Sequence, residues 1–213
     1  RVAAACPMIP ENLLNRPVLT ILSGAAALLL CSCGAQFDTR NKVLVSVRDQ
    51  RMMVVKDGIA VKSYPVSTSK YGLGDKPGSR RTPLGTMKIA RKIGSGAPSG
   101  AVFKSRRRTG EVLRPNAPGR DPIVSRILWL QGTQYKNRNA YRRYIYIHGT
   151  PEEWRVGSPA SYGCIRMKSR DVIDLYQRVG VGAEVRIIRG SLFSPPQASG
   201  QYAAGPVQAR AGG

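Results

Sequence analysis

The sequence predicts a mainly β fold with a single helix near its end. Two observations support this prediction. Short segments alternate apolar and polar residues with a period of two, and turn signals such as Asp57-Gly58 separate them. Residues 169–179 instead repeat their apolar side chains at helical spacing. The alternating segments outnumber the helical one, and this sets the fold class.

The first strands are expected to form a β-meander. Val43, Val45 and Val47 alternate with polar neighbours, which predicts a first strand. Residues 52–56 and 59–67 give the next two strands, and Asp49-Gln50 and Asp57-Gly58 provide the turns between them.

A long irregular region follows the meander. Residues 67–86 are rich in Ser, Gly and Pro, and they lead into a short strand at 87–90. Residues 91–125 are expected to be a flexible, arginine-rich surface excursion. A second hypothesis for this excursion is a lid or rim that attracts a carboxylate-bearing substrate, which neutralising Arg106 to Arg108 would test.

The later elements bring the chemistry-bearing residues together. Residues 126–132 and 144–148 are predicted strands. In the second strand Ile145 and Ile147 face one side, while the tyrosines and His148 face the other. Gly149 is expected to end that strand and to leave His148 at its edge.

The predicted helix begins with Ser169 as N-cap and Asp171 in its first turn, and Gly180 ends it. Its apolar face consists of Val172, Leu175, Tyr176 and Val179. Residues 183–188 alternate again and give a last strand.

The N-terminus predicts export. Residues 18–30 are an apolar run that follows Arg16 and has the length of a signal-peptide core, so residues 1–35 are assigned to a signal peptide. Two ends of this segment stay open: lipidation at Cys33, which would anchor the chain to a membrane, or ordinary cleavage after Ala35. The expected location is the periplasm or cell envelope.

The remaining boundaries follow from composition. Residues 36–41 form a linker, 42–189 form the folded domain, and 190–213, with few apolar clusters, form a disordered tail.

The formal net charge of +22 implies an anionic partner, which could be nucleic acid, phospholipid or a cell-wall polymer. Nucleic acid is disfavoured because the arginine-rich stretch has little aromatic interleaving, Phe103 being nearly alone, and because the chain carries an export signal. An anionic cell-wall surface is the expected partner.

Cys164 and His148 form a candidate catalytic pair. His148 is the chain's one histidine, Cys164 is the one cysteine of the expected folded domain, and the two lie sixteen residues apart. An imidazole can take the proton of a thiol and so activate it as a nucleophile. Gly163 allows a close backbone approach, and N–H groups there could hold an oxyanion. The alternative is a buried apolar cysteine and an unrelated histidine.

Two motifs carry a family resemblance: His148-Gly149-Thr150, and Ser161-Tyr162-Gly163-Cys164-Ile165-Arg166-Met167. Together with the following helix and strand, they resemble the L,D-transpeptidase catalytic domain of the YkuD type. The resemblance covers about residues 42–188 and implies a β-sandwich-like, mostly antiparallel fold with a helix beside the active-site cysteine.

The resemblance also implies roles for the site residues. Cys164 would be the nucleophile and His148 its general base and acid, with Gly149 and Thr150 orienting the imidazole. Ser161 would lie beside the acyl donor. Arg166 would either hold a stem-peptide carboxylate or brace the loop.

Two further features come from the same comparison. Thr82-Pro83-Leu84-Gly85-Thr86 resembles the segment that lines the donor cleft, so Thr82 and Gly85 are expected to set its shape. Many members have His where this chain has Tyr162, which leaves His148 as the only imidazole and makes Tyr162 a candidate hydrogen-bond donor near the oxyanion. No metal or other cofactor is expected.

The implied function is L,D-transpeptidation of peptidoglycan stem peptides through a cysteine thioester, with release of D-Ala and transfer to an amine. The acceptor is either a second stem or a wall-anchored protein. L,D-carboxypeptidase activity and a non-enzymatic, basic, wall-binding lipoprotein remain the alternatives.

Overall fold

A computed structural model describes residues 37–193 of the chain. The expected signal peptide with Cys33, and most of the expected tail, lie outside the described residues. Within residues 37–193, no helix has the length and hydrophobicity needed to cross a membrane.

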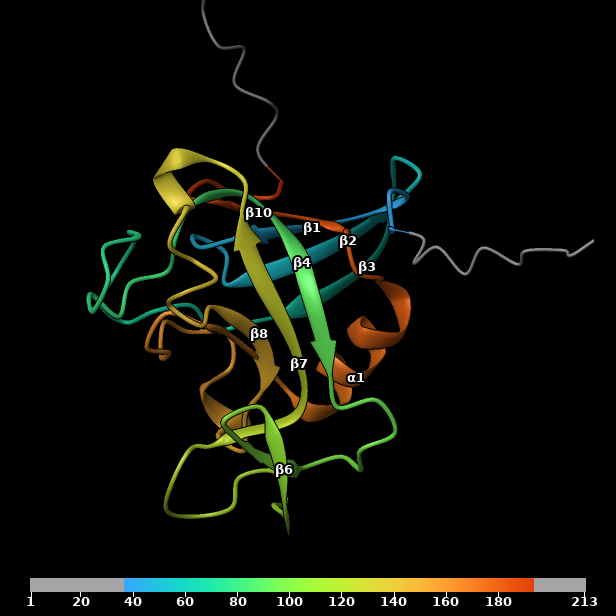
Figure 1. Ribbon diagram of the computed structural model, residues 1–213, viewed down its shortest axis with the longest axis vertical. Helices are drawn as coiled ribbons and strands as arrows, with labels where there is room; N and C mark the ends of the chain where they lie inside the picture. The colour runs from blue at the N-terminus through green and yellow to red at the C-terminus, as the bar shows by residue number, and fades with distance from the viewer. Residues whose placement is uncertain (1–36, 194–213) are drawn as a thin grey trace, which may run out of the picture. The chain divides into compact units, whose positions relative to one another are not determined.

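The described residues form ten strands, one α-helix and two short 3₁₀ helices (Figure 1). The strands are β1 (Asn41–Ser46), β2 (Arg51–Lys56), β3 (Ile59–Pro65), β4 (Gly85–Ile93), β5 (Ala101–Lys104), β6 (Arg107–Val112), β7 (Ile123–Gly132), β8 (Tyr146–Gly149), β9 (Ile165–Met167) and β10 (Glu184–Ile188). The helices are η1 (Tyr135–Asn137), η2 (Glu153–Arg155) and α1 (Ser169–Arg178). This confirms the mainly β fold with one α-helix after the cysteine.

The strands form a mixed sheet that branches at β7. Its main path runs β3-β2-β1-β10-β4-β7-β5-β6, and β8 and β9 leave this path by pairing first with β7 and then with each other. The β1/β10 and β8/β9 pairs are parallel, and the other pairs are antiparallel. This branched sheet is the expected β-sandwich-like, mostly antiparallel fold.

The predicted meander is confirmed as β1 to β3. Gln50 lies in the first turn with φ +46°, and Asp57 and Gly58 form the second with φ +49° and +85°. Positive φ at both central residues matches the twist of the flanking strands, which explains why Asp-Gly suits this hairpin.

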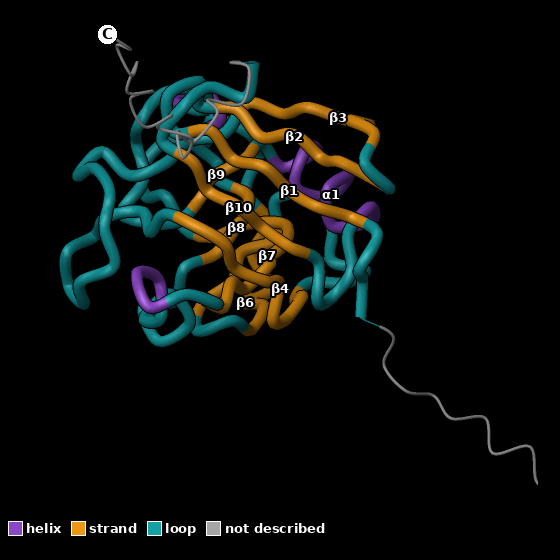
Figure 2. Tube along the Cα trace, turned by 90° about the horizontal axis from the view of Figure 1, so that it is seen from above, coloured by secondary structure: helices purple, strands orange, loops and turns teal. Residues whose placement is uncertain are grey.

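The alternation of β7 and β8 places a hydrophobic cluster on each side of these strands. Leu128 and Ile147 belong to the larger cluster, which contains buried residues of α1, whereas Trp129 and Tyr146 belong to the smaller one. The helix α1 (purple in Figure 2) contacts β7 and β8, and Tyr64 on β3 donates a hydrogen bond to Asp174 on α1 at 2.7 Å.

The structure differs from the prediction in residues 91–125. This segment was expected to be a flexible excursion, but it contains the β5–β6 hairpin, whose strand β5 also pairs with β7. Its turn consists of Ser105 and Arg106, both with positive φ. The signal was missed because neither residue is a usual turn former at such φ values.

The strand containing His148 was predicted to end at His148, but β8 continues through Gly149. It is the last residue of β8 and pairs with Val124 on one side and Met167 on the other. A Cβ at this position would lie 2.6 Å from the Val124 carbonyl oxygen, so close packing is what requires glycine here.

Ser169 is not the N-cap of α1. The N-cap is Lys168, and α1 ends at Arg178 with Val179 as C-cap, before Gly180. Ser169 instead accepts a hydrogen bond from the Ser125 hydroxyl in the interior, and its N–H donates to the Glu153 carboxylate at 2.7 Å. Glu153 therefore caps the helix from a distant segment.

Candidate active site

The parallel pairing of β8 and β9 places His148 and Cys164 on one face. Ile147 pairs with Ile165 and His148 pairs with Arg166, and both isoleucines point into the larger cluster. Because side chains alternate along a strand, His148, Arg166 and Cys164 lie on the opposite face. Extending this register by one residue pairs Cys164 with Tyr146 and puts the Cα atoms of Cys164 and His148 about 8 Å apart. Among residues 37–193 no hydrogen bond joins the two side chains; the thiol donates to the Tyr144 carbonyl and the imidazole bonds the Gly149 carbonyl.

The Cys164 thiol contacts backbone groups at the start of β8 and just before it. Among residues 37–193 it is a free cysteine, and its Sγ donates to the Tyr144 carbonyl oxygen at 3.4 Å. Tyr144 holds that carbonyl with φ +57°, an uncommon value for an aromatic residue. Burial raises the pKa of the Cys164 thiol, while a hydrogen bond from the Tyr146 N–H and the positive charge of Arg166 oppose this shift.

His148 is held as a neutral base. Its Nδ1 lies 2.8 Å from the Gly149 carbonyl oxygen, which can only accept a hydrogen bond, so Nδ1 carries the proton and Nε2 is left with a lone pair. Burial lowers the pKa of His148 to about 4; the Gly149 carbonyl opposes this shift, and Arg166 adds to it. With a raised thiol pKa and a lowered imidazole pKa, the resting pair is neutral.

The loop before Cys164 is braced by Ser161. The buried Ser161 hydroxyl donates to the Cys164 carbonyl at 2.5 Å and accepts from the Gly163 N–H at 3.2 Å. The Gly163 N–H is therefore occupied, whereas the Cys164 N–H has no acceptor among residues 37–193. Of the two N–H groups near which the oxyanion was predicted, Gly163 and Cys164, only the Cys164 N–H is without an acceptor among residues 37–193, and the bonds of Ser161 favour a supporting position over contact with substrate.

Thr82 lies against the cysteine loop, whereas Gly85 does not. The buried Thr82 hydroxyl donates to the Gly163 carbonyl at 3.1 Å. Gly85 has φ +98°, and a Cβ there would lie 2.3 Å from the Gln134 Oε1 beside η1. Thr82 therefore shapes the cysteine loop directly, and Gly85 shapes the start of β4.

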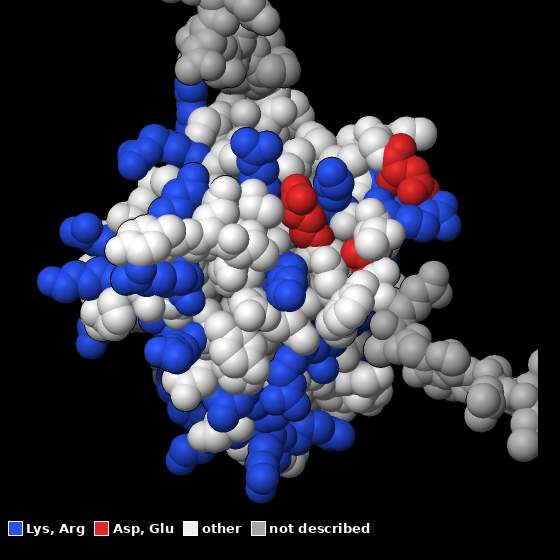
Figure 3. Space-filling view, turned by 45° about the horizontal axis from the view of Figure 1, so that its top comes forward, with Lys and Arg blue, Asp and Glu red and all other residues white. Residues whose placement is uncertain are grey.

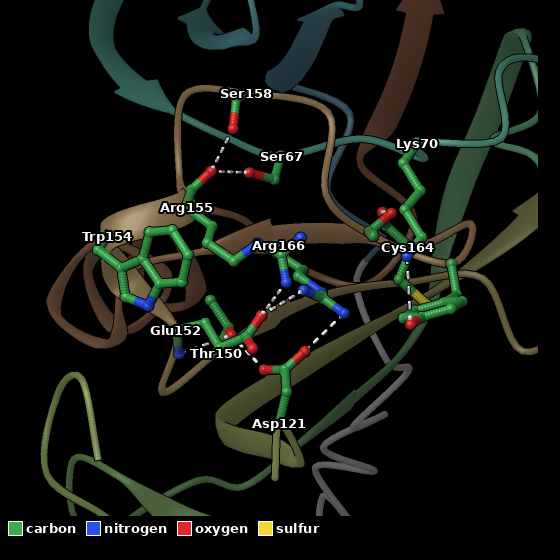
Figure 4. Close-up of polar contacts among 12 residues, drawn as sticks. Ser67, Lys70, Asp121, Thr150, Glu152, Trp154, Arg155, Ser158, Cys164 and Arg166 are labelled. Atoms are coloured by element: carbon green, nitrogen blue, oxygen red, sulfur yellow. Dashed lines mark hydrogen bonds and ion pairs between the residues drawn. The ribbon is translucent and has the colours of Figure 1, made fainter. Parts of the chain in front are cut away.

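Arg166 is enclosed by two carboxylates (Figure 4). Its Nη2 lies 2.5 Å from Asp121 Oδ2 and its Nη1 lies 3.3 Å from Glu152 Oε2, and only 7% of its side chain is exposed. The buried Thr150 hydroxyl also donates to Asp121. Both terminal nitrogens of Arg166 are engaged, which favours the bracing interpretation over a free carboxylate binder.

Asp121 and Glu152 were missed by the sequence analysis. Asp121 lies in the segment interpreted as a surface excursion, and Glu152 lies in a loop with no motif. One signal was available. The chain has 12 Asp and Glu against 34 Lys and Arg, so a motif arginine that becomes buried has few carboxylates to pair with, and each of these was a candidate partner.

An aromatic cluster borders the thiol on the same face. Trp129 stacks on Tyr141 with ring centroids 4.1 Å apart and meets Tyr146 edge-on at 5.6 Å. The Arg106 guanidinium, from the β5–β6 turn, lies 5.1 Å from the rings of both Trp129 and Tyr144. Figure 3 shows dense Lys and Arg surface at the lower end of the view, where β6 lies in Figure 1.

These features define a class of protein: a mainly β domain in which a cysteine and a neutral histidine lie on one face of a parallel strand pair. The chain belongs to the family of L,D-transpeptidase catalytic domains (YkuD), whose family model matches residues 40–187.

Solved structures with similar folds include three L,D-transpeptidases. One from Mycobacterium smegmatis has 16% identity and a TM-score of 0.46, over 70% of this chain and 58% of that one. One from Mycobacterium tuberculosis H37Rv has 17% and 0.45, over 70% and 58%. One from Enterococcus faecium has 15% and 0.45, over 71% and 50%.

This chain therefore spans less than two thirds of the length of each of these structures. A comparison with curated proteins finds no match. The family assignment depends on the family model and not on these structural similarities.

Proposed function

We propose that this protein is a cysteine-dependent L,D-transpeptidase that acts on peptidoglycan stem peptides. The family assignment supports the reaction class and the substrate class. The observation that carries the proposal is the β8/β9 register, which brings Cys164 and the Nε2 lone pair of His148 to one face.

In the proposed first step, Cys164 attacks the carbonyl of the bond between the third stem residue and its terminal D-Ala. Because the resting pair is neutral, the thiol proton moves to His148 Nε2 as the C–S bond forms, and the Tyr146 N–H stabilises the developing thiolate. His148 then gives that proton to the amine of D-Ala as the C–N bond breaks. The product is a thioester on Cys164 and free D-Ala.

The tetrahedral oxyanion of this step requires a hydrogen-bond donor. The Cys164 N–H is unoccupied and adjacent to the reacting sulfur, so we assign it this role. One well-aimed donor contributes about 3 kcal/mol to stabilising the transition state.

In the second step an amine from another stem, or from a wall-anchored protein, attacks the thioester and transfers its proton to His148 Nε2. The Cys164 sulfur then leaves and recovers a proton. Water in place of the amine would give L,D-carboxypeptidase activity. We propose that the reaction takes place in the cell envelope, because the apolar run 18–30 followed by Cys33 predicts export and the substrate is a wall polymer.

The test is mass spectrometry of a purified disaccharide-tetrapeptide incubated with the wild-type chain or with Cys164→Ala. Loss of D-Ala with dimer formation by the wild type alone is the expected result. Loss of D-Ala without dimers would identify a carboxypeptidase. No conversion by a folded wild-type chain would contradict the enzymatic proposal and favour a wall-binding lipoprotein.

A further inference from the structure

Two exposed cations beside the cysteine loop have no acidic partner among residues 37–193. Lys70 and Arg80 both come from the loop between β3 and β4, and neither takes part in an ion pair with a described residue. The Lys70 Nζ lies 4.7 Å and the Arg80 Cζ 5.7 Å from the ring centroid of Tyr162. Both cations therefore converge on a residue two positions before Cys164.

The backbone holds these cations in place. The Lys70 N–H donates to the Ser161 carbonyl at 3.1 Å, and the Ser69 hydroxyl donates to the Arg80 carbonyl at 2.5 Å. Arg80 has φ +56°, a conformation that persists in a non-glycine residue only where its surroundings impose it. Figure 4 draws Lys70 descending toward the loop that carries Cys164.

The charge around Tyr162 is not balanced. Arg166 also lies near this ring, with its Cζ 5.8 Å from the centroid, but Asp121 and Glu152 neutralise it. Lys70 and Arg80 thus repel each other across the ring with no described carboxylate between them. An anion placed there would relieve this repulsion and gain two charge-assisted contacts.

Two half-exposed tyrosines, Tyr71 and Tyr162, lie beside Lys70 and Arg80. Tyr71 is 41% exposed and Tyr162 52% exposed, and their ring centroids lie 5.7 Å apart. Lys70 and Arg80 also lie near the Tyr71 ring, at 5.3 and 5.9 Å. Rings beside cations offer a flat apolar surface next to an anion site, which suits a peptide that bears a carboxylate.

We propose that Lys70 and Arg80, supported by the rings of Tyr71 and Tyr162, form a subsite for a carboxylate of the peptide substrate. The proposal rests on the proposed function and adds a recognition element to it. The Cα atoms of Tyr162 and Cys164 lie within about 7 Å, so the bound carboxylate belongs to a residue close to the reacting carbonyl. Arg166, whose nitrogens are engaged, does not carry out this recognition.

The test measures binding and does not depend on turnover. Isothermal calorimetry compares a disaccharide-tetrapeptide with its form in which the carboxylates are converted to carboxamides. The protein is Cys164→Ala, alone or combined with Lys70→Gln and Arg80→Gln. The matched control combines Lys42→Gln with Arg186→Gln, two exposed cations on β1 and β10.

The expected result is about a tenfold loss of affinity for the carboxylate ligand in the Lys70/Arg80 variant, with less than about a twofold change in the control. The carboxamide ligand should bind all three proteins equally. A variant that combines Lys70→Arg with Arg80→Gln keeps the positive charge at position 70 and should recover part of the lost affinity. Thermal unfolding should show that every variant is folded.

A second arm identifies the source of the carboxylate. In the chain that retains Cys164, Lys70→Gln combined with Arg80→Gln is assayed for D-Ala release with the donor as the only substrate. A raised KM in this assay assigns the carboxylate to the donor stem. An unchanged donor KM, with a raised KM for the acceptor in dimer formation, assigns it to the acceptor.

The proposal is overturned by equal affinities in the Lys70/Arg80 variant and its parent, by equal losses for both ligands, or by no binding to folded Cys164→Ala. Unchanged affinity together with D-Ala release by the wild type would remove the subsite and leave the proposed function standing. Carboxylate-dependent binding without D-Ala release by the wild type would support the subsite and contradict the proposed function.

Discussion

Replacing Arg166 by Met should destabilise the fold strongly. The substitution keeps most of the side-chain volume but leaves the carboxylates of Asp121 and Glu152 without their cation. Removing one partner of a fully buried ion pair costs about 3–5 kcal/mol. Because the Asp121 and Glu152 side chains are 15% and 21% exposed, we expect the lower end, about 3 kcal/mol. For a chain of this size that lowers Tm by about 6–12 °C.

The assay is urea unfolding of four proteins: wild type, Arg166→Met, Asp121→Asn and the double variant. In the Asp121→Asn background, Arg166→Met should lower the free energy of unfolding by at least about 1 kcal/mol less than in the wild type. The reason is that only the Glu152 carboxylate is then left without its cation. Arg178→Met is the matched control, since its pair with Asp174 is more exposed, at 40% and 34%, and should contribute about 0.5 kcal/mol. If Arg166→Met costs no more than the control, or if the cycle is additive, the bracing role of Arg166 is wrong.

Of four further predictions, two concern the histidine, one its glycine neighbour and one the hairpin. Because burial lowers the pKa of His148 to about 4, the rate of D-Ala release should stay level as pH falls from 7 to 5 and drop only near 4; an acid limb at 6.5 would contradict the buried neutral imidazole. The same shift means that stability present above pH 6.5 is lost as pH falls toward 4, by about 3 kcal/mol, and His148→Gln should remove this dependence in urea unfolding. Gly149→Ala should cost about 2 kcal/mol in urea unfolding, since its Cβ would lie 2.6 Å from the Val124 carbonyl; a neutral effect would refute the close packing. Arg106→Gln should speed amide hydrogen exchange in β5 and β6 by removing its contacts with Trp129 and Tyr144, whereas the exposed Arg108→Gln should not.

Local patterns predicted the elements whose partners lie nearby in sequence. Asp57-Gly58 specified its own hairpin, and the period of two correctly placed Tyr146 and Ile147 on opposite faces of β8, although the strand was predicted from residue 144 and begins at Tyr146. The helical spacing of Val172 and Leu175 likewise identified the buried face of α1. These signals are local because turn geometry and side-chain period depend on adjacent residues only.

The features that were missed depend on contacts between distant segments. β9 has three residues, too few for a reliable alternation, and it exists because it pairs with β8. Asp121 has no motif of its own and acquires its place from Arg166 and Thr150. The helix cap went to Glu153 for the same reason, since a carboxylate from another segment reached the Ser169 N–H. The sequence patterns predicted Cys164 and His148 as a candidate catalytic pair, and that assignment stays a prediction; they did not predict Asp121, Glu152 or Glu153.

The most direct test of the central claim is the intact mass of the protein after a brief incubation with disaccharide-tetrapeptide and acid quenching. We predict that the wild-type chain gains the mass of the acyl-disaccharide-tripeptide, that hydroxylamine removes it as expected for a thioester, and that Cys164→Ala gains nothing. An adduct that persists in Cys164→Ala, or D-Ala release by that variant at the wild-type rate, would contradict the assignment of Cys164 as the nucleophile.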